Sequence, residues 1–500
     1  MRDARTGELP RGPLRANGIK PVLHLIGLVL LSTAGMMLLP MLADIYFSNS
    51  DWKAFATAAV LSTVTGLILL QASSGAPQAG LTLRQAFLLT PLSWLSVSLV
   101  SALPFFLSDY GIVSRSMADA FFEAVSGITT TGATVISGLE KAPPGILLWR
   151  ATLQWMGGIG IIATAIAILP ALGIGGMQLF RTESSDRSEK VMPRVRVMAV
   201  AISAVYLGLT ILATMVYWLA GMNAFDALAH AFTTIATGGY STSDKSFGNW
   251  EANGIQWFAT LFMLSGSIPF VLYVRFIAGD YRAFWDRQLK TMLVFLACVV
   301  LVVGTWLVIS GQYALEPAFR HAAFNIVSVV TTTGYASADY ALWGNAVVGL
   351  FFGLMFVGGC TGSTSGGIKI FRFEVMAIML KAHFLRLLYP RGVFPRSYGD
   401  RSLDNEVIGS VLAFFTVFFL CYGALTIALM GLGLDFLTSA SGAVSALSNV
   451  GPGLGRSIGP AGNFGSLPDA AKWLLSIGML LGRLELFTVL ILFVPRFWRG

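Results

Sequence analysis

Long apolar stretches separated by short polar segments run through most of the 500-residue chain. An apolar stretch of ~20 residues can cross a bilayer core of ~30 Å as a helix. Shorter apolar segments of about a dozen residues lie between some of these stretches and cannot cross. The pattern predicts ten spans, at residues 22–42, 53–71, 86–107, 145–170, 195–220, 255–277, 289–310, 343–380, 406–432 and 470–494, and four short segments, at 117–129, 225–236, 317–330 and 435–447.

Each short segment leads into a loop that repeats one motif around a single glycine. The first copy is AVSGITTTGAT at residues 124–134, and the copies align without a gap on Gly132, Gly239, Gly334 and Gly451. Six residues before each glycine stands a hydroxyl side chain, and four before stands an aliphatic one. These residues are Ser126, Thr233, Ser328 and Ser445, and Ile128, Ile235, Val330 and Leu447. Four such copies in one chain predict a pore built from four equivalent units.

The expected fold is an all-α polytopic membrane protein with two N-terminal transmembrane helices and four helix–pore loop–helix repeats around a central ion pore. Composition agrees, because 55% of residues are hydrophobic and 12% are charged, whereas soluble domains are about a quarter charged. The predicted divisions are a cytoplasmic tail at 1–20, the two leading helices at 21–85, and repeats at 86–185, 186–288, 289–400 and 401–500, the third with a broken second helix.

The four short segments are expected to be half-length helices that end at the loops. Asp119, Asp226 and Asp435 each open an apolar run, where a carboxylate can cap free backbone N–H groups. Non-helical backbone at membrane depth is tolerated only where it is buried in protein or lines water. Because helix C-termini carry partial negative charge, four of them directed at the loops favour a cation.

The distribution of basic residues gives the orientation. With the N-terminus in the cytoplasm and ten spans, 24 of the 33 Lys and Arg residues fall inside and 8 outside, with Arg483 within a span. This bias predicts cytoplasmic N- and C-termini and places the four glycine loops on the outer side. The net charge of +8 lies in short loops, so no nucleic-acid partner is expected.

The loops offer backbone carbonyl groups as ligands. Rings of carbonyl oxygens can replace the hydration shell of an ion, and glycine at the next position allows backbone angles closed to other residues. No ring of carboxylates lies at the loops, which favours a monovalent cation over Ca²⁺ or Mg²⁺. The alternative is four glycine turns that only reverse the chain. The predicted carbonyl ligands belong to Thr130, Thr131, Thr237, Gly238, Thr332, Thr333, Asn449 and Val450.

The loop sequences TTTGAT, ATGGYS, TTTGYAS and SNVGPG, together with the two leading helices, resemble the Trk/Ktr/HKT superfamily of K⁺ transporters over nearly the whole chain, and most closely its TrkH type. The Ktr type lacks the leading helices. The resemblance implies K⁺ uptake across a bacterial inner membrane, with K⁺ as the transported ion and no covalently bound cofactor. Because these filters depart from the T-V-G-Y-G of K⁺ channels, some Na⁺ or Rb⁺ passage is expected.

A glycine-rich segment, GGCTGSTSGG, interrupts the last span of the third repeat. Glycine disfavours helix by ~1 kcal/mol relative to alanine, so a broken helix with polar backbone at mid-depth is expected, below the filter. A flexible linker outside the membrane is the alternative. The resemblance implies an intramembrane gating loop here, formed by Gly358, Gly359, Gly362, Ser363, Thr364, Gly366 and Gly367.

Arg483 lies near the middle of the last predicted span. An unpaired arginine there costs ~2.5–3.5 kcal/mol, so it should face a wet or protein-lined interior. The alternative is a packing role through Glu485 or a backbone carbonyl, although residues two apart lie on different helix faces. The resemblance implies a basic gating residue at this position, below the filter. His230 occupies the position of Glu123 and Asn325 in the repeat and is expected to be a satisfied polar residue.

The resemblance also implies partners: a cytosolic nucleotide-binding regulatory subunit of the TrkA type, for which the basic stretch 381–401 offers a docking surface, and a second copy of the chain in a homodimer. Two other transport modes stay open. One is Na⁺-coupled K⁺ symport of the Ktr type. The other is secondary antiport, which would require inverted repeats and ionisable residues in the spans. Without a nucleotide motif or a nucleophile–base set, an enzyme is not expected.

Overall fold

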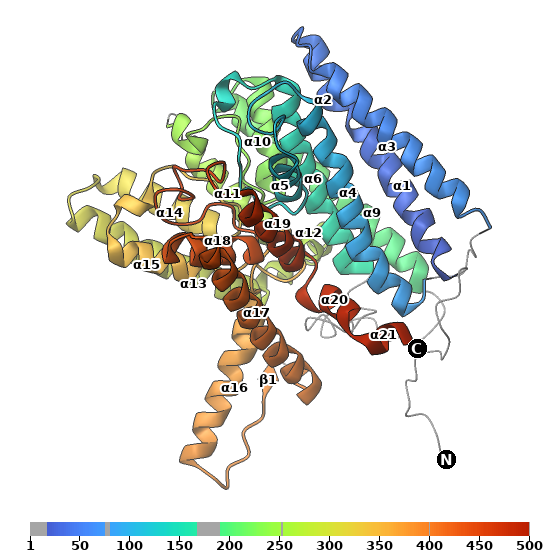
Figure 1. Cartoon of the computed structure of the whole chain (residues 1–500). Coiled ribbons are helices and arrows are strands. Elements are labelled where there is room, and N and C mark those ends of the chain that lie inside the picture. The colour runs from blue at the N-terminus through green and yellow to red at the C-terminus, as the bar shows by residue number, and fades with distance from the viewer. Residues whose placement is uncertain (1–17, 76–80, 168–190, 252–253, 400, 500) are drawn as a thin grey trace, which may run out of the picture.

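The computed structural model describes residues 18–75, 81–167, 191–251, 254–399 and 401–499. The fold is all-α, as predicted, apart from a short antiparallel hairpin of β1 (Ser397–Tyr398) and β2 (Arg401–Ser402). Helices α16 and α17 extend away from the rest of the molecule next to this hairpin (Figure 1).

The two leading spans form a helical pair along one edge of the molecule (Figure 1). The first consists of α1 (Lys20–Met36) and α2 (Leu38–Tyr46), and the second is α3 (Trp52–Ala72). Gly27 of α1 faces Gly66 of α3, where a Cβ atom on either glycine would lie within 3.0 Å of the carbonyl oxygen of the other. Small residues at this crossing therefore let the two helices approach closely.

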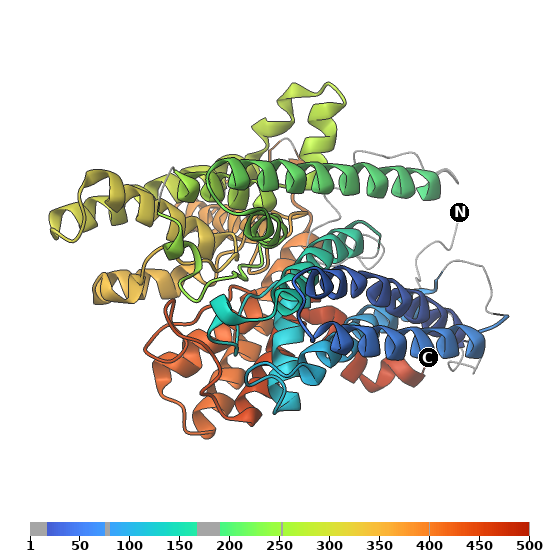
Figure 2. The same ribbon diagram turned by 90° about the horizontal axis from the view of Figure 1, so that it is seen from above.

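Four units of helix, short helix and helix follow. In Figure 2 they surround the middle of the molecule, with the leading helices to one side. The short helices match the predicted segments within a few residues. The units are α4 (Leu83–Leu107), α5 (Met117–Ile128) and α6 (Pro144–Ala167); α9 (Val191–Leu219), α10 (Ala224–Ile235), α11 (Ile255–Ser267) and α12 (Phe270–Ile277); α13 (Arg287–Ile309), α14 (Leu315–Val330), α15 (Asn345–Leu354) and α16 (Ile370–Leu388); and α17 (Asn405–Gly431), α18 (Phe436–Ser448), α19 (Asp469–Arg483) and α20 (Leu486–Leu490), before the terminal α21 (Pro495–Arg499).

The short helices lie in the interior. Every residue of α5 from Ala118 to Ile128 is buried, and so is every residue of α18 from Thr438 to Ser448. The long helix α13, in contrast, exposes apolar side chains such as Val294 and Val302, as expected for a helix that faces lipid. Half-length helices are thus enclosed by protein, which is the condition for ending a helix at membrane depth.

Within the described residues, six helical spans are long and apolar enough to cross a membrane, and two bent helix pairs raise the number to eight. The other two of the ten predicted spans correspond to α6, described as far as Ala167, and to the interrupted pair α15 and α16.

Two predicted spans are not continuous, which corrects the expectation from hydropathy. The axes of α11 and α12 differ by 91°, and those of α19 and α20 by 110°. Pro269 explains the first bend, because proline forces Ile268 into an extended conformation and removes a helical N–H donor. The second bend contains Glu485 in the left-handed region, with φ of 59°. Arg483 therefore ends a helix and does not lie in the middle of one.

The expected capping by aspartate is correct for one short helix. Asp435 caps α18 by accepting a hydrogen bond from the backbone N–H of Thr438, at 3.0 Å. Helices α5 and α10 are instead capped by Ser116 and Asn223, with the aspartates three residues further on. A carboxylate in the first turn still interacts favourably with the helix dipole, so the sequence signal indicated the helix starts but not the capping atoms.

Candidate ion pathway

The four glycine loops share one backbone conformation. The residue two positions before each glycine is left-handed although it is not glycine, with φ between 50° and 56°. The following N–H donates to the carbonyl of the hydroxyl residue in the short helix, at 2.8–3.0 Å. The left-handed residues are Thr130, Thr237, Thr332 and Asn449, and the donor–acceptor pairs are Thr131–Ser126, Gly238–Thr233, Thr333–Ser328 and Val450–Ser445. Four copies of an uncommon conformation confirm the register predicted from the sequence.

The loops meet in a closed ring. A Cβ atom placed on any of the four glycines would lie closer than 3.0 Å to a carbonyl oxygen of the next loop. For Gly132, Gly239, Gly334 and Gly451 these oxygens belong, in that order, to Gly238, Thr333, Val450 and Thr131. Each oxygen comes from the residue directly before the next glycine, so the contacts run from the first loop to the fourth and back to the first. All eight residues predicted as carbonyl ligands therefore belong to one ring of loops.

Glycine is required in this ring for two reasons. The φ angles of the four glycines lie between 80° and 110°, which disfavours any side chain. In addition, a Cβ atom would collide with the neighbouring loop. A loop that only reversed the chain would need the positive φ angle, but it would not need the close contact with a neighbouring loop.

Polar residues of the short helices hold the outer part of each loop. Glu123 accepts a hydrogen bond from the Val135 N–H at 2.9 Å, and Asn325 accepts one from the Ser337 N–H at 3.2 Å. His230, at the same position of the repeat, lies 3.0 Å from the Ser241 hydroxyl through Nε2. Its other nitrogen lies 2.8 Å from a backbone carbonyl. His230 is thus a satisfied polar residue, as expected.

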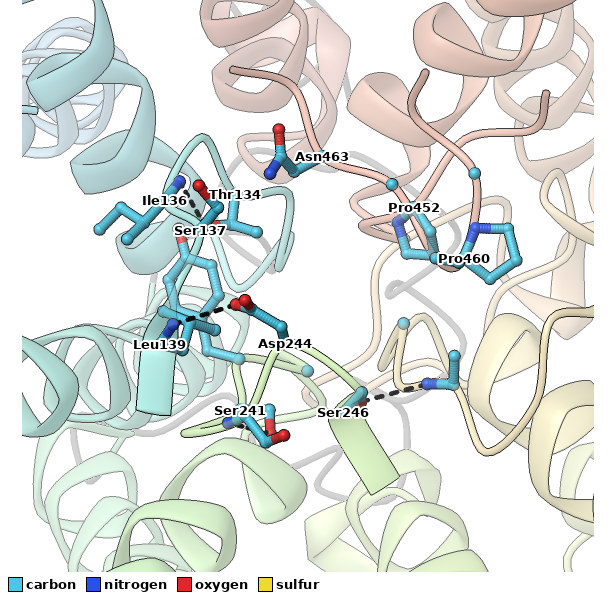
Figure 3. Close-up of a pocket in the computed structure, with 18 of the residues that line it drawn as sticks. Thr134, Ile136, Ser137, Leu139, Ser241, Asp244, Ser246, Pro452, Pro460 and Asn463 are labelled. Atoms are coloured by element: carbon cyan, nitrogen blue, oxygen red, sulfur yellow. Dashed lines mark hydrogen bonds between the residues drawn. The ribbon is translucent and has the colours of Figure 1, made fainter. Parts of the chain in front are cut away.

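A cavity of about 180 Å³ lies against the ring and is lined by residues of all four loops (Figure 3). Asp244 extends along its wall and accepts hydrogen bonds from the N–H groups of Gly138 and Leu139, at 2.7 and 3.1 Å. Nearby, burial raises the pKa of Glu140, but hydrogen bonds from Ser243 and from the backbone outweigh it, so the net shift is downward. Negative charge is therefore present at this mouth, although no carboxylate belongs to the ring.

The glycine-rich segment lies between α15 and α16 and touches the base of the ring. The Thr364 hydroxyl lies 3.1 Å from the hydroxyl of Thr237, and the Gly366 N–H donates to Thr332 Oγ1 at 2.7 Å. A Cβ atom on Gly366 would collide with the carbonyl oxygen of Ser448. These contacts reach loops of the second, third and fourth units, so the segment is enclosed by protein. The alternative of a linker outside the membrane is wrong.

Arg483 reaches the same segment. Its side chain is 3% exposed and donates from Nη1 to the Thr364 carbonyl at 2.8 Å and from Nη2 to the Gly157 carbonyl at 3.3 Å. Glu485 pairs with Arg372 of α16 instead, at 2.6 Å. Of the two partners that the packing alternative offered, Glu485 is thus engaged elsewhere, whereas backbone carbonyls do hold the guanidinium group.

A family model described as "TrkH: Cation transport protein" matches residues 53–499. The chain belongs to the TrkH family. The Trk system potassium uptake protein TrkI of Halomonas elongata is 47% identical over 96% of this chain and 97% of its own length, and the TrkH protein of the same organism is 37% identical over 96% and 99%. The crystal structure of the potassium transporter TrkH from Vibrio parahaemolyticus matches with a TM-score of 0.87 and 34% identity, covering 96% of this chain and 99% of that one.

This TrkH-family chain is thus a member of a family of transport proteins and not an enzyme, and the resemblance inferred from the loop motifs is confirmed. Three glycines that pack against the short helices were not predicted. A Cβ atom would collide with a carbonyl oxygen at the end of a short helix if it were added to Gly157, Gly266 or Gly482. Those oxygens belong to the aliphatic repeat residues Ile128, Ile235 and Leu447. A search for glycine at similar distances after each loop could have found this second repeat.

Two basic residues that the sequence assigned to the outer side, Arg150 and Lys472, are buried in ion pairs. Arg150 counted as an outer-loop charge, yet it is 1% exposed and pairs with Glu123 at 2.7 Å. Lys472 counted likewise and pairs with Asp119 at 2.5 Å, both nearly inaccessible. A basic residue near the end of a predicted span therefore indicates a side of the membrane, but it does not tell whether the side chain is buried.

Proposed function

We propose that this protein mediates K⁺ uptake across a bacterial inner membrane through a pore centred on the ring of four loops. Its relatives named above are potassium uptake proteins by name, and they match over nearly their whole length. The N- and C-termini lie in the cytoplasm in this proposal, in keeping with the 24:8 distribution of basic residues.

The closed cycle of glycine and carbonyl contacts carries the proposal. Backbone carbonyls before each glycine act as the selectivity filter by replacing water around the ion. The C-termini of α5, α10, α14 and α18 add partial negative charge at the ring. Dipoles without carboxylates suit a monovalent cation.

The glycine-rich segment Gly358–Gly367 acts as the gate below the filter. Support comes from its hydrogen bonds to Thr237 and Thr332, which place it against the ring. Arg483 fixes the closed position through the Thr364 carbonyl and adds a positive charge to the path. Opening requires these few hydrogen bonds to be replaced by others. The net free-energy cost is small, because one hydrogen bond is exchanged for another.

Regulation comes from a cytosolic nucleotide-binding subunit of the TrkA type, and the protein functions as a homodimer. The projecting end of α16 and the β1–β2 hairpin offer the docking surface, since this part extends away from the ring (Figure 1). Exposed Leu387, Leu388 and Val393 give it an apolar component beside its basic residues. A movement of α16 caused by the bound subunit would act directly on the glycine-rich segment, because α16 begins three residues after Gly367.

Rb⁺ uptake into liposomes containing the purified protein tests the proposal. Stronger competition by K⁺ than by Na⁺ is the expected result for the parent. Gly132→Ser and Gly334→Ser should each increase Na⁺ passage relative to K⁺, because a side chain forces the neighbouring carbonyl away. Gly349→Ser is the matched control, since a Cβ atom at Gly349 meets nothing within 4 Å. Parental selectivity in both ring variants would exclude these loops as the filter.

The same vesicles distinguish gated conduction from Na⁺-coupled symport. Uptake that is unchanged when Na⁺ is omitted supports passive or gated conduction. Uptake that requires Na⁺ supports the symport of the Ktr type.

A further inference from the structure

The second loop differs from the other three at the residue before its ring glycine. This residue is Gly238, whereas the other loops have Thr131, Thr333 and Val450. Gly238 does not have a positive φ, unlike Gly239 beside it. The backbone conformation therefore does not explain a glycine at position 238.

The side chain of Gln154 explains it. A Cβ atom on Gly238 would collide with the carboxamide of this residue, which lies on α6 and is 0% exposed. Gln154 donates from Nε2 to the Gly238 carbonyl at 2.6 Å and accepts at Oε1 from the Tyr240 N–H at 3.0 Å. One carboxamide thus bonds to the backbone on both sides of the ring glycine Gly239.

The first and third loops have an internal brace that the second lacks. Their hydroxyl pairs, Thr129 with Thr131 and Thr331 with Thr333, lie 2.7 and 2.8 Å apart. At the corresponding positions the second loop has Ala236 and Gly238, which have no hydroxyl groups. Gln154 therefore supplies from the neighbouring unit a support that the other two loops make from their own side chains.

Arg150, one turn earlier on α6, holds the outer part of the same loop. Its Nη1 donates to the Ser241 carbonyl at 2.8 Å, and its guanidinium lies 4.0 Å from the centre of the Tyr240 ring. Glu123 fixes Arg150 from the other side through the buried pair. Buried pairs of this kind are favourable only with good geometry and further hydrogen bonds, and here those bonds lead to the second loop.

We propose that Gln154 is a positioning residue that determines ion selectivity by fixing the Gly238 carbonyl in the ring. The inference rests on the proposed role of the ring as the filter. A carbonyl oxygen has two lone pairs, so the bond from Gln154 leaves Gly238 able to contact an ion while limiting its movement. Without Gln154 the Gly238 carbonyl would have neither a hydroxyl pair within its own loop nor the bond from α6, while Arg150 would still hold the outer part of the loop.

Gln154→Leu tests this by keeping the size of the side chain and removing both hydrogen bonds. The Na⁺:K⁺ flux ratio should rise roughly fivefold, the factor that corresponds to one net hydrogen bond of about 1 kcal/mol. Gln256→Leu is the matched control. Gln256 is also buried, donates to the Phe247 carbonyl at 3.1 Å and accepts from Arg320 Nη1 at 2.8 Å, all outside the ring. It should lose stability to a similar degree and keep the parental flux ratio.

A compensating pair gives a second readout that loss of folding cannot imitate. Gly238→Thr alone should disturb selectivity and stability, because the new side chain collides with Gln154. Gly238→Thr combined with Gln154→Ala removes that collision and should recover thermal stability. It should not recover selectivity, because Ala236 offers no hydroxyl group to the new threonine and the Gln154 carboxamide is gone. Parental selectivity in the stable double variant would overturn the inference.

The outcomes separate this inference from the proposed filter. If Gly334→Ser changes the flux ratio and folded Gln154→Leu does not, Gln154 has no role in selectivity while the filter stands. Equal changes in Gln154→Leu and Gln256→Leu also overturn the inference, because they indicate general loosening. If Gly132→Ser and Gly334→Ser both keep the parental ratio, the filter fails and the inference fails with it.

Discussion

At the scale of single residues, Arg483 brings to the middle of the protein a positive charge that pairs with no carboxylate in the described part of the chain. Both of its hydrogen bonds go to backbone carbonyls, of Thr364 and Gly157. Among the described carboxylates the nearest in sequence, Glu485, is engaged by Arg372. The guanidinium therefore connects the glycine-rich segment to α6 and α19 through backbone carbonyls and forms no ion pair with a described carboxylate, which suits a residue that obstructs a cation.

Arg483→Ala should speed K⁺ passage. Two unit charges 6 Å apart repel by roughly 3 kcal/mol at an effective dielectric near 20, and each 1.36 kcal/mol is a factor of ten in rate. Water in the pore lowers this figure, so we expect an increase of about tenfold in tracer flux. Arg483→Lys should stay near the parental flux. A folded alanine variant with parental flux would remove Arg483 from the mechanism, and loss of expression without faster flux would indicate a packing role.

The buried pair of Glu123 and Arg150 makes a second prediction at this scale. Arg150→Leu leaves the Glu123 carboxylate buried and unpaired, which typically costs about 3–5 kcal/mol of unfolding free energy. Glu123→Leu together with Arg150→Leu should cost less than Arg150→Leu alone. Thermal unfolding in detergent measures both variants. A double variant that is less stable than either single one would contradict this account.

At the scale of elements, breaks in the second helix of a unit are a recurring feature. The described parts of units two, three and four contain one each: the bend at Pro269, the glycine-rich segment, and the bend after Arg483. All three meet at the base of the ring. Thr364 accepts from Arg483 and bonds the Gly266 carbonyl at the end of α11, at 2.9 Å. Contacts between ends of helices are easier to rearrange than contacts along their lengths, since they involve few bonds.

Deletion of Gly362, Ser363 and Thr364 should raise basal flux without changing selectivity. The deletion removes the Thr364 contacts to Thr237 and Arg483 but none of the ring residues. Deletion of residues 48–50, in the largely exposed connection between α2 and α3, is the control of equal length and should leave basal flux unchanged. Rb⁺ efflux from preloaded vesicles measures both. Flux at or below the parental level in a folded deletion variant would count against a gate.

At the scale of the whole molecule, the first and last units must meet to close the ring. Phe464, after the fourth loop, donates from its N–H to the Thr134 carbonyl of the first loop at 2.8 Å. Asn449 donates to Thr131 Oγ1 at 3.0 Å. Lys472 and Asp119 add an ion pair between α19 and α5. More than 300 residues separate these partners, so the pore is complete only when the last unit has folded against the first.

The leading helices are fixed to this assembly through Asp44. Its carboxylate, fully buried at the end of α2, accepts a hydrogen bond from the Gly145 N–H at the start of α6, at 2.6 Å. Asp44→Ala should lower stability by about 1–2 kcal/mol, as loss of a helix cap does, while the flux ratio of Na⁺ to K⁺ stays parental. Thermal unfolding and tracer uptake check the two parts. A changed flux ratio would mean that the leading helices act on the filter.

The sequence by itself determined the membrane class, the four units and the ring glycines. Apolar runs have a length fixed by the bilayer, and the glycines have a local backbone requirement, so both can be recognised without knowing their neighbours. The glycine-rich break was also visible, because helix propensity is a local property.

Tertiary structure decided the rest. The bend after Arg483, the pairing of Glu485 with Arg372, and the burial of Arg150 all depend on residues that are distant along the chain. Gly238 is the clearest case. The sequence predicted its carbonyl group as a ligand but gave no reason for a glycine at this position. The reason is the Gln154 side chain, 84 positions earlier. Local pattern can predict where a loop turns, but the side chain that fills the space beside it is chosen by the packing of helices from another unit.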